Sequence, residues 1–360
     1  MKTMQYLLPL LLSVTLANAK VIRVDNNVGA SADYVKLQDA INNADPGDSI
    51  YIMGSATYYD VNDRGNAIEI RLNKQVAIIG PGYFLGENGQ TQANKQTAAI
   101  HLLNIGEGAD NVVITGVSFR RRTDSRIFLN LERLDGSQGS TSPQNITLSR
   151  NYIATLWIYN ASNTLIDQNF FSTNSNPIYL RENAVRTIIR NNILLSGNNS
   201  ATIYGDFNSP LPNTVIANNT FSNGLFRISG ATVQNNIFIS GGFNDCDNNV
   251  VRNNLFTTTQ EAVLPENSTG NEASNNIYSA VQANLFVSPD PSVDNQFQLA
   301  AQSPALGQGI EGVDLGAYGG AAPYQLSGLP AIPAIYELTT SGVGTPAEGM
   351  SVTIRAKSHN

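Results

Sequence analysis

The chain has 360 residues and a formal net charge of −7, with hydrophobic residues at 41% and charged residues at 14% of the sequence. The acidic balance argues against nucleic acid as a partner, because neutralising phosphates requires clustered cations on a basic surface. The hydrophobic fraction also excludes a disordered chain. Cys246 is the only cysteine, so no internal disulfide can form, and we expect a buried, unreactive thiol.

The first 19 residues have the pattern of a secretory signal peptide. Lys2 precedes an apolar run over residues 7–12 and the small-residue site Ala17-Asn18-Ala19, which predicts cleavage before Lys20. The mature protein is therefore expected to be secreted or held at the cell surface. No later stretch approaches the roughly 18 apolar residues that a membrane helix needs, so we expect no membrane span.

A helical cap is predicted at about residues 30–48. Apolar residues recur there at helical spacing, namely Leu37, Ala40, Ile41 and Ala44, and Asp45-Pro46-Gly47-Asp48 ends the element. The run over residues 49–52 then reads as a first strand. A cap suits stacked strands, because an open edge would pair with strands of other chains.

An Asn pair followed by an apolar residue and usually an aromatic recurs from about residue 145 to residue 278. The copies begin at Asn191, Asn218, Asn235, Asn253 and Asn275, with weaker copies at Arg150 and Gln168. Their second Asn residues stand at positions 151, 169, 192, 219, 236, 254 and 276, so successive copies are never closer than 17 residues. Repeats of this size indicate stacked coils, each of which buries its apolar face only against its neighbours.

A second anchor stands eight residues before the last apolar position of each copy. It is occupied by Asn145, Asn163, Arg186, Asn213, Gly230, Asn248 and Gly270. Short β-branched runs between the anchors, such as Thr187-Ile188-Ile189, predict short strands. The pattern favours an all-β parallel β-helix with ladders of equivalent Asn side chains. A leucine-rich repeat would need a Leu-x-x-Leu-x-Leu frame, which we do not find.

Three segments resemble secreted right-handed parallel β-helix proteins of the pectin-lyase-like fold. Pro46-Gly47-Asp48-Ser49-Ile50, with Thr57-Tyr58 after it, resembles their entry motif, and residues 79–85 and 303–320 resemble segments of exported bacterial members. The resemblance covers about residues 20–325 and implies a single-stranded, right-handed β-helix domain there. It does not imply an activity, because this fold hosts lyases, hydrolases, adhesins and binding proteins.

Residues 326–360 lie beyond the repeat. The runs over residues 335–338 and 351–355 read as strands and predict a short C-terminal β extension. This extension could be a hairpin packed on the last coil or an exposed tail that contacts another protein.

Aromatic residues beside arginines are the main binding candidates. Trp157, Tyr179 and Tyr204 occur in equivalent strands of successive coils, near Arg181 and Arg227. If these rings face outward they would form a flat platform for sugar rings, and if they face inward they belong to the core. Arg120 and Arg121, in the basic run over residues 120–126, could bind a uronate or sulfate group, although such a run is also typical of a solvated loop.

Catalytic signals are weak. The absence of Lys from residue 96 to residue 356 disfavours a lyase with a lysine base, which leaves Arg181, Arg186, Arg190, Arg227 and Arg252 as candidate bases. His101 and His359 lack the Gly-His-Gly-like context of hydrolases with this fold. Asp245 and Asp247 are weak candidates for a carboxylate pair or a Ca²⁺ site, but they could equally cap a turn. We therefore expect no cofactor.

The sequence favours an exported β-helix protein that recognises an extracellular or cell-surface polysaccharide, without evident catalysis. One alternative is a polysaccharide lyase or glycoside hydrolase that acts on uronate-containing glycans. Another is a structural or adhesin-like surface protein. The sequence does not indicate an oligomeric state.

Overall fold

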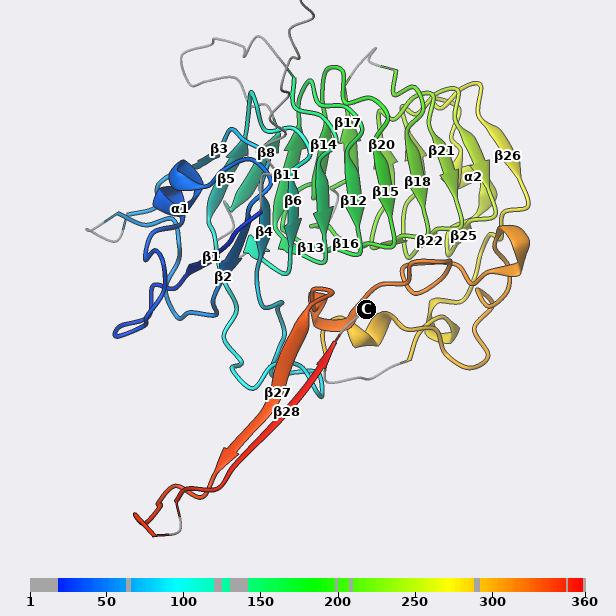
Figure 1. The fold of residues 1–360 in the computed structure, drawn as a ribbon. Helices are drawn as coiled ribbons and strands as arrows, with labels where there is room; N and C mark the ends of the chain where they lie inside the picture. The colour runs from blue at the N-terminus through cyan, green and yellow to red at the C-terminus, as the bar shows by residue number, and fades with distance from the viewer. Residues whose placement is uncertain are drawn as a thin grey trace, which may run out of the picture.

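The computed structural model describes residues 19–62, 66–119, 125–129, 142–197, 200–206, 210–287, 292–347 and 349–358. Residues 1–18 of the predicted signal peptide lie outside this part of the chain, as do the candidates Arg120 and Arg121 and the histidine His359. Figure 1 shows that the described residues form a row of stacked coils, which runs from the N-terminal end in blue to the last coil in yellow.

Three parallel sheets run along the stack in the described residues. In spatial order, the first sheet contains β1 (Val21–Val24), β2 (Ser49–Ile52), β4 (Ala77–Ile79), β6 (Val113–Thr115), β9 (Thr147–Ser149), β12 (Leu165–Asp167), β15 (Ile188–Arg190), β18 (Val215–Ala217), β21 (Thr232–Gln234), β24 (Val250–Arg252) and β26 (Glu272–Ser274). The second contains β3 (Ile70–Leu72), β5 (Leu102–Ile105), β8 (Arg126–Leu129), β11 (Thr155–Ile158), β14 (Ile178–Leu180), β17 (Ile203–Gly205), β20 (Leu225–Phe226) and β23 (Phe243–Asn244). The third contains β7 (Ser118–Phe119), β10 (Tyr152–Ile153), β13 (Phe170–Ser172), β16 (Ile193–Leu195), β19 (Thr220–Phe221), β22 (Ile237–Phe238) and β25 (Leu255–Phe256).

Neighbouring coils pair in parallel within each of these sheets. The protein is therefore a parallel β-helix, as predicted. Right-handed connections are the rule between parallel strands. The boundaries of the predicted domains stay predictions.

The core consists of columns of identical or similar side chains, one from each coil. In the first sheet the inward column is fully buried from β2 to β24, where it contains Ile50, Ile78, Ile114, Leu148, Ile166, Ile189, Ile216, Val233 and Val251. In the third sheet the inward ring of Phe238 stacks between those of Phe221 and Phe256, with both centroid distances at 4.7 Å. The final aromatic of the repeated phrase is thus a core residue, stabilised by the coil above and the coil below.

The second Asn of each repeat forms a buried amide ladder at the turn between the first and third sheets. Asn219 shows the pattern: its Nδ2 donates to Asn236 Oδ1 at 3.0 Å, and its Oδ1 accepts from Asn192 Nδ2 at 3.0 Å. The same bond joins Asn151 to Asn169, Asn169 to Asn192, Asn236 to Asn254 and Asn254 to Asn276. The predicted Asn ladder is therefore present.

Both sequence anchors are turn residues with left-handed backbone angles. At the first position of the pair φ lies between +51° and +57°, for Arg150, Gln168, Asn191, Asn218, Asn235, Asn253 and Asn275. The second anchor is also left-handed in every copy, as in Asn213 at +59° and Gly230 at +75°. Asn and Gly tolerate this region best, which explains why they recur there.

At the N-terminal end of the stack lies the helix α1 (Leu37–Asn43), within the range predicted for the cap (Figure 1). Leu37, Ala40 and Ile41 are fully buried, so the apolar side of the helix joins the core. A second short helix, α2 (Gln260–Val263), follows β25. No helix among the described residues has the length and apolar character that crossing a membrane requires.

After β26 the chain turns back along the stack toward the N-terminal end, drawn from yellow to orange in Figure 1. It contains the short 3₁₀ helices η1 (Gln282–Asn284), η2 (Asn295–Phe297), η3 (Ile310–Gly312) and η4 (Leu326–Gly328). We call residues 303–329 the return segment. It covers the outer face of the third sheet, where Phe170, Ile193, Ile237 and Leu255 are fully buried beside it.

The first position of the repeated phrase holds the return segment in place in most copies. Its side chains donate to backbone carbonyls of that segment, one coil after another: Asn253 to Gln308, Asn218 to Asp314, Asn191 to Gly319, Gln168 to Pro323 and Arg150 to Leu329, at 2.7 to 3.2 Å. The repeated Asn pair therefore has two roles, one inside the turn and one outside it.

The predicted C-terminal extension is an antiparallel hairpin of β27 (Pro333–Thr340) and β28 (Val352–Ser358), which projects from the stack (Figure 1). Ala93 N donates to Ile335 O at 2.8 Å, and Lys357 Nζ donates to Gln90 Oε1 at 3.0 Å. The hairpin thus contacts the loop between β4 and β5. The alternative that places it on the last coil is wrong, because the return segment carries the chain back past most of the coils first.

Candidate functional site

A column of aromatic side chains runs along the outer face of the second sheet. Phe128, Trp157, Tyr179, Tyr204 and Phe226 are register partners on five consecutive strands, from β8 to β20. Their sequence neighbours Ile127, Leu156, Ile178, Ile203 and Leu225 point inward and are buried. Four of the five rings are half-buried, and Phe128 is 8% exposed. The rings therefore face outward rather than into the core, which were the two alternatives that the sequence left open.

The rings stack on one another along the column. Trp157 and Tyr179 lie almost parallel, with centroids 4.0 Å apart. Tyr204 is tilted against Tyr179 at 5.6 Å and against Phe226 at 5.0 Å. The central rings therefore direct their faces at each other, and the expectation of a flat open platform is wrong. Ring edges and phenol hydroxyls reach the surface instead, because parallel strands place equivalent side chains directly above each other.

Arg181 lies against the middle of this column and is held by a carboxylate. Its guanidinium carbon is 5.2 Å from the Trp157 ring, 5.4 Å from Tyr179 and 5.3 Å from Tyr204, which is within cation–π range. Its Nη1 donates to Asp206 Oδ1, and the backbone N of Glu182 donates to the other oxygen of Asp206 at 3.1 Å. Both charged side chains are about three-quarters buried, so the pair has a fixed geometry.

Arg227 repeats this arrangement two strands further along. Its Nη1 donates to Tyr204 Oη at 3.1 Å, and its guanidinium carbon is 4.7 Å from the Phe226 ring. Arg227 Nε is 3.9 Å from Asp245 Oδ2 on the next coil. Asp245 Oδ1 also accepts from Asn267 Nδ2 at 2.7 Å. The column therefore carries two Arg–Asp pairs beside the phenol hydroxyl of Tyr204.

Gly205 is the residue that allows Arg227 to approach. Arg227 follows β20 with a left-handed φ of +54°, which turns its carbonyl toward β17. A Cβ on Gly205 would lie 2.0 Å from that carbonyl oxygen, a distance that no side chain tolerates. A glycine in the strand is thus explained by a close backbone contact.

The structure divides the candidate bases between two faces. Arg181 and Arg227 lie on the second sheet. Arg186 bonds Asn163 Oδ1 at 2.7 Å, and Arg190 bonds Asp167 Oδ1 at 3.1 Å. Arg252 bonds Gln234 Oε1 at 3.1 Å. These last three belong to the first sheet or its edge, so the five arginines do not form one site.

Asp247 caps a backbone amide, as the turn alternative predicted, whereas Asp245 binds side chains. Asp247 Oδ1 accepts from the backbone N and the hydroxyl of Thr269, at 2.6 and 2.8 Å, while Asp245 binds Asn267 and Arg227. Each carboxylate thus binds groups of a neighbouring coil. In the ranges that the structure describes, no three His, Cys, Asp or Glu side chains come together as a metal ion would require.

Burial raises the pKa of two carboxyl groups, and both lie outside the column. Burial raises the pKa of Asp60, although Oδ2 accepts from the backbone N of His101 and Leu102 at 2.6 and 2.7 Å. Burial also raises the pKa of Asp167, opposed by its bond from Arg190. Their hydrogen bonds with backbone amides and with the Arg190 guanidinium give these two carboxylates a structural role. Burial likewise raises the pKa of the Cys246 thiol to about 12, so it is unreactive at neutral pH, as predicted.

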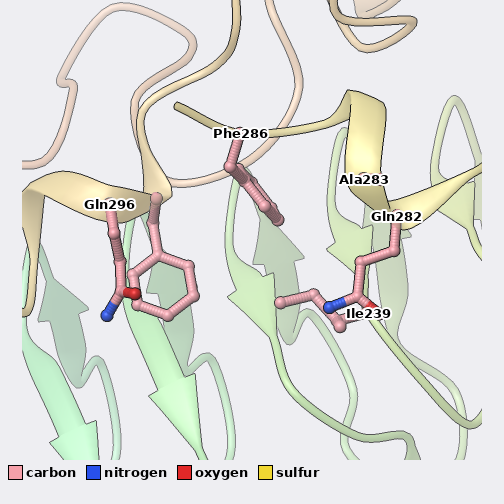
Figure 2. Close-up of a pocket in the computed structure, with 6 residues that line it drawn as sticks. Ile239, Gln282, Ala283, Phe286 and Gln296 are labelled. Carbon is pink, nitrogen blue, oxygen red and sulfur yellow. The ribbon is translucent and has the colours of Figure 1, made fainter. Parts of the chain in front are cut away.

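A pocket of about 480 Å³ lies between β22 and the chain that turns back toward the N-terminal end (Figure 2). Its lining is Ile239, Gln282, Ala283, Phe286, Gln296 and Phe297. Phe286 and Phe297 meet edge to face at 5.7 Å. None of these six side chains is ionisable, so the pocket lacks an acid, a base or a charge with which to bind an anion.

No protein-family model matches this sequence, and a search of curated proteins found no match. The solved structures similar to it include the PL6 family alginate lyase AlyGC, with a TM-score of 0.39 and 13% identity over 72% of this chain and 38% of that one. The catalytic domain of a GH87 alpha-1,3-glucanase in complex with nigerose has a TM-score of 0.22 and 12% identity over 68% and 64%. The alginate lyase from Paenibacillus sp. str. FPU-7 has a TM-score of 0.27 and 12% identity over 72% and 98%.

The chain thus spans well under half the length of AlyGC. At these identities the likeness concerns the fold alone, since one fold hosts many activities.

Sequence reasoning missed Asp206 and Phe128 as members of the column. Asp206 stands two residues after Tyr204, as Arg181 stands two residues after Tyr179, so the equal offset is a signal that could have paired them. Phe128 follows the basic run and had no repeat phrase before it to set its register.

Proposed function

We propose that the protein recognises an extracellular or cell-surface polysaccharide with the outer face of the second sheet. The supporting observation is the column of half-buried aromatic rings on consecutive coils, flanked by two Arg–Asp pairs. Ring edges and phenol hydroxyls with guanidinium groups beside them suit sugars, which combine apolar C–H groups with hydroxyls. The predicted signal peptide supports a place outside the cell membrane.

The outer faces of the other two sheets are less suited to binding a polysaccharide. The third sheet has its outer face under the return segment, and the outer face of the first sheet presents mainly short β-branched and polar side chains such as Val215 and Thr232. The column on the second sheet spans four inter-strand steps, or about 19 Å, which is longer than one sugar ring.

Co-sedimentation with insoluble plant, algal and bacterial polysaccharides tests this proposal. Tyr204→Ala and Arg227→Ala should each reduce the bound fraction, because the hydroxyl and guanidinium that meet in the column are then lost. Arg252→Ala, which removes an exposed arginine from the first sheet, is the matched control and should bind like the unaltered protein. Binding that survives both column variants would place the glycan site elsewhere.

The lyase alternative rests on an arginine base. Both column arginines already bind carboxylates, which supports a binding role over proton abstraction. Ultraviolet absorbance of unsaturated products during incubation with uronate-containing polysaccharides distinguishes the two roles. An increase that Arg181→Ala or Arg227→Ala abolishes would favour the lyase.

A further inference from the structure

The column arginines differ from an anion-binding pair in one respect: each is already compensated by a carboxylate. Arg181 binds Asp206, whose second oxygen is fixed by the backbone N of Glu182. Arg227 lies 3.9 Å from Asp245, which is fixed by Asn267. Sugar carboxylates or sulfates would have to displace these aspartates or lie beside them, and like charges in a partly buried place repel strongly.

The other charged residues on this face also argue against an anionic ligand. Besides the two pairs, Glu182 adds an exposed negative charge next to Arg181. Arg126 is exposed on the outer side of β8, at the far end of the column near Phe128. Among the described residues along this face, one exposed charge of each sign thus accompanies Arg–carboxylate pairs, which include Arg71–Glu69 near the N-terminal end. The described part of this face therefore has no excess of positive charge that would attract a polyanion.

An Arg–Asp pair is well suited to hydroxyl groups. A hydroxyl donates to the carboxylate and accepts from the guanidinium, so a neighbouring pair of sugar hydroxyls can bind both members without breaking the ion pair. The two arginines follow β14 and β20, and their aspartates follow β17 and β23, so the pairs repeat along the stack. A ligand that uses both must extend parallel to the column.

Building on the proposed function, we infer that the ligand is a linear, uncharged polysaccharide that lies along the stack, with its hydroxyls bound by Arg181–Asp206 and Arg227–Asp245. The class of glycan is thus neutral, in contrast to the uronate or sulfate that arginines alone would suggest.

Titration calorimetry with defined oligosaccharides tests the inference. The probes are neutral cello-, xylo-, manno- and laminari-oligosaccharides, from di- to hexasaccharides, and charged oligogalacturonates and alginate oligomers, each at low and high sodium chloride concentration. We expect a neutral series to bind more tightly as it lengthens, with an affinity that salt leaves unchanged. A uronate series that binds more tightly, and weakens with salt, would overturn the inference while leaving the proposed function intact.

The direction in which Asp206→Asn changes the affinity distinguishes a neutral ligand from an anionic one. For a neutral ligand the variant loses a charged acceptor and should bind about tenfold more weakly. For an anionic ligand the same variant frees Arg181 and should bind more tightly, which would contradict the inference. Asp167→Asn, which alters an Arg–Asp pair on the first sheet, is the control and should leave affinity unchanged. Circular dichroism verifies that each variant is folded.

The same experiments give a different result if the proposed function itself is wrong. If none of the oligosaccharides binds, and co-sedimentation also fails, both proposals fall together. If a neutral oligosaccharide binds and neither Asp206→Asn nor Arg227→Ala changes its affinity, the column is not the site and the inference is overturned.

Discussion

At the scale of single residues, the two neighbouring asparagines of the repeated pair have different structural roles. In Asn218-Asn219 the first residue adopts a left-handed φ of +53° and binds the return segment, whereas the second is fully buried and belongs to the amide ladder. A carboxylate could not replace the second one, because each amide in the ladder must donate to one coil and accept from another.

The ladder predicts a large cost for a single truncation. Asn219→Ala removes the side chain whose Nδ2 donates to Asn236 Oδ1 and Ile189 O, and whose Oδ1 accepts from the backbone N of Asn192. Because several buried groups lose their partners at once, we expect the free energy of unfolding to fall by about 3 kcal/mol or more. Urea denaturation measures the loss.

Asn73→Ala, which truncates an exposed asparagine, serves as the comparison and should change the free energy of unfolding by less than about 0.5 kcal/mol. Equal losses in the two variants would mean that the ladder contributes nothing specific.

At the scale of elements, the return segment closes the structure by joining distant parts of the chain. Its anchor is Asp294, a fully buried residue just before that segment. Asp294 Oδ1 accepts from Asn88 Nδ2 at 2.9 Å, and Oδ2 accepts from the backbone N of Ser327 at 2.7 Å and from Tyr324 Oη at 3.2 Å. A carboxylate with this many donors can stay buried without a paired cation.

We expect Asp294→Ala to lower the free energy of unfolding by about 3 kcal/mol, because the hydrogen bonds of its carboxyl group are lost and four donors, Ser292 Oγ among them, are left without this partner. Thermal unfolding followed by circular dichroism detects this change. Asp39→Ala, on the exposed side of α1, is the control for removing a negative charge. An unchanged melting temperature in Asp294→Ala would show that the return segment is not held by this residue.

At the scale of the whole molecule, the hairpin of β27 and β28 stands apart from the stack. Leu338 and Ile354 are register partners and remain 54% and 58% exposed, so one face of the hairpin is apolar and uncovered. A two-stranded hairpin is marginal by itself. It contributes nothing to the columns of buried side chains that stabilise the coils.

Removing residues 333–360 should therefore leave the melting temperature within about 2 °C of the full chain. The column on the second sheet is intact in the shortened protein, so polysaccharide co-sedimentation should also persist. If the truncated protein still binds polysaccharide but no longer attaches to cells, the adhesin-like alternative gains support. If the coils unfold at a much lower temperature, the hairpin has a structural role that its hydrogen bonds with Gln90 and Ala93 do not explain.

The coils could be predicted from the sequence because their determinants are local. Each turn depends on a left-handed residue and each strand on a short alternating run, so Asn191-Asn192-Ile193-Leu194 contains most of what its own turn requires. Stacking then follows, since no coil can bury its apolar face alone. The all-β class, the parallel β-helix and the ladder were determined in this way by the sequence itself.

The candidate site depended on tertiary structure because its members come from different coils of unequal length. Trp157, Tyr179 and Tyr204 are separated by 22 and 25 residues, so no fixed period predicts that their rings stack or that Asp206 binds Arg181. The strand register determines which of these residues contact each other. Because the rings stack on one another, they expose their edges rather than the flat platform that the sequence predicted. The return segment is likewise a tertiary feature, because its partners lie as far away as Arg150 and Leu329 and no local rule relates positions that distant.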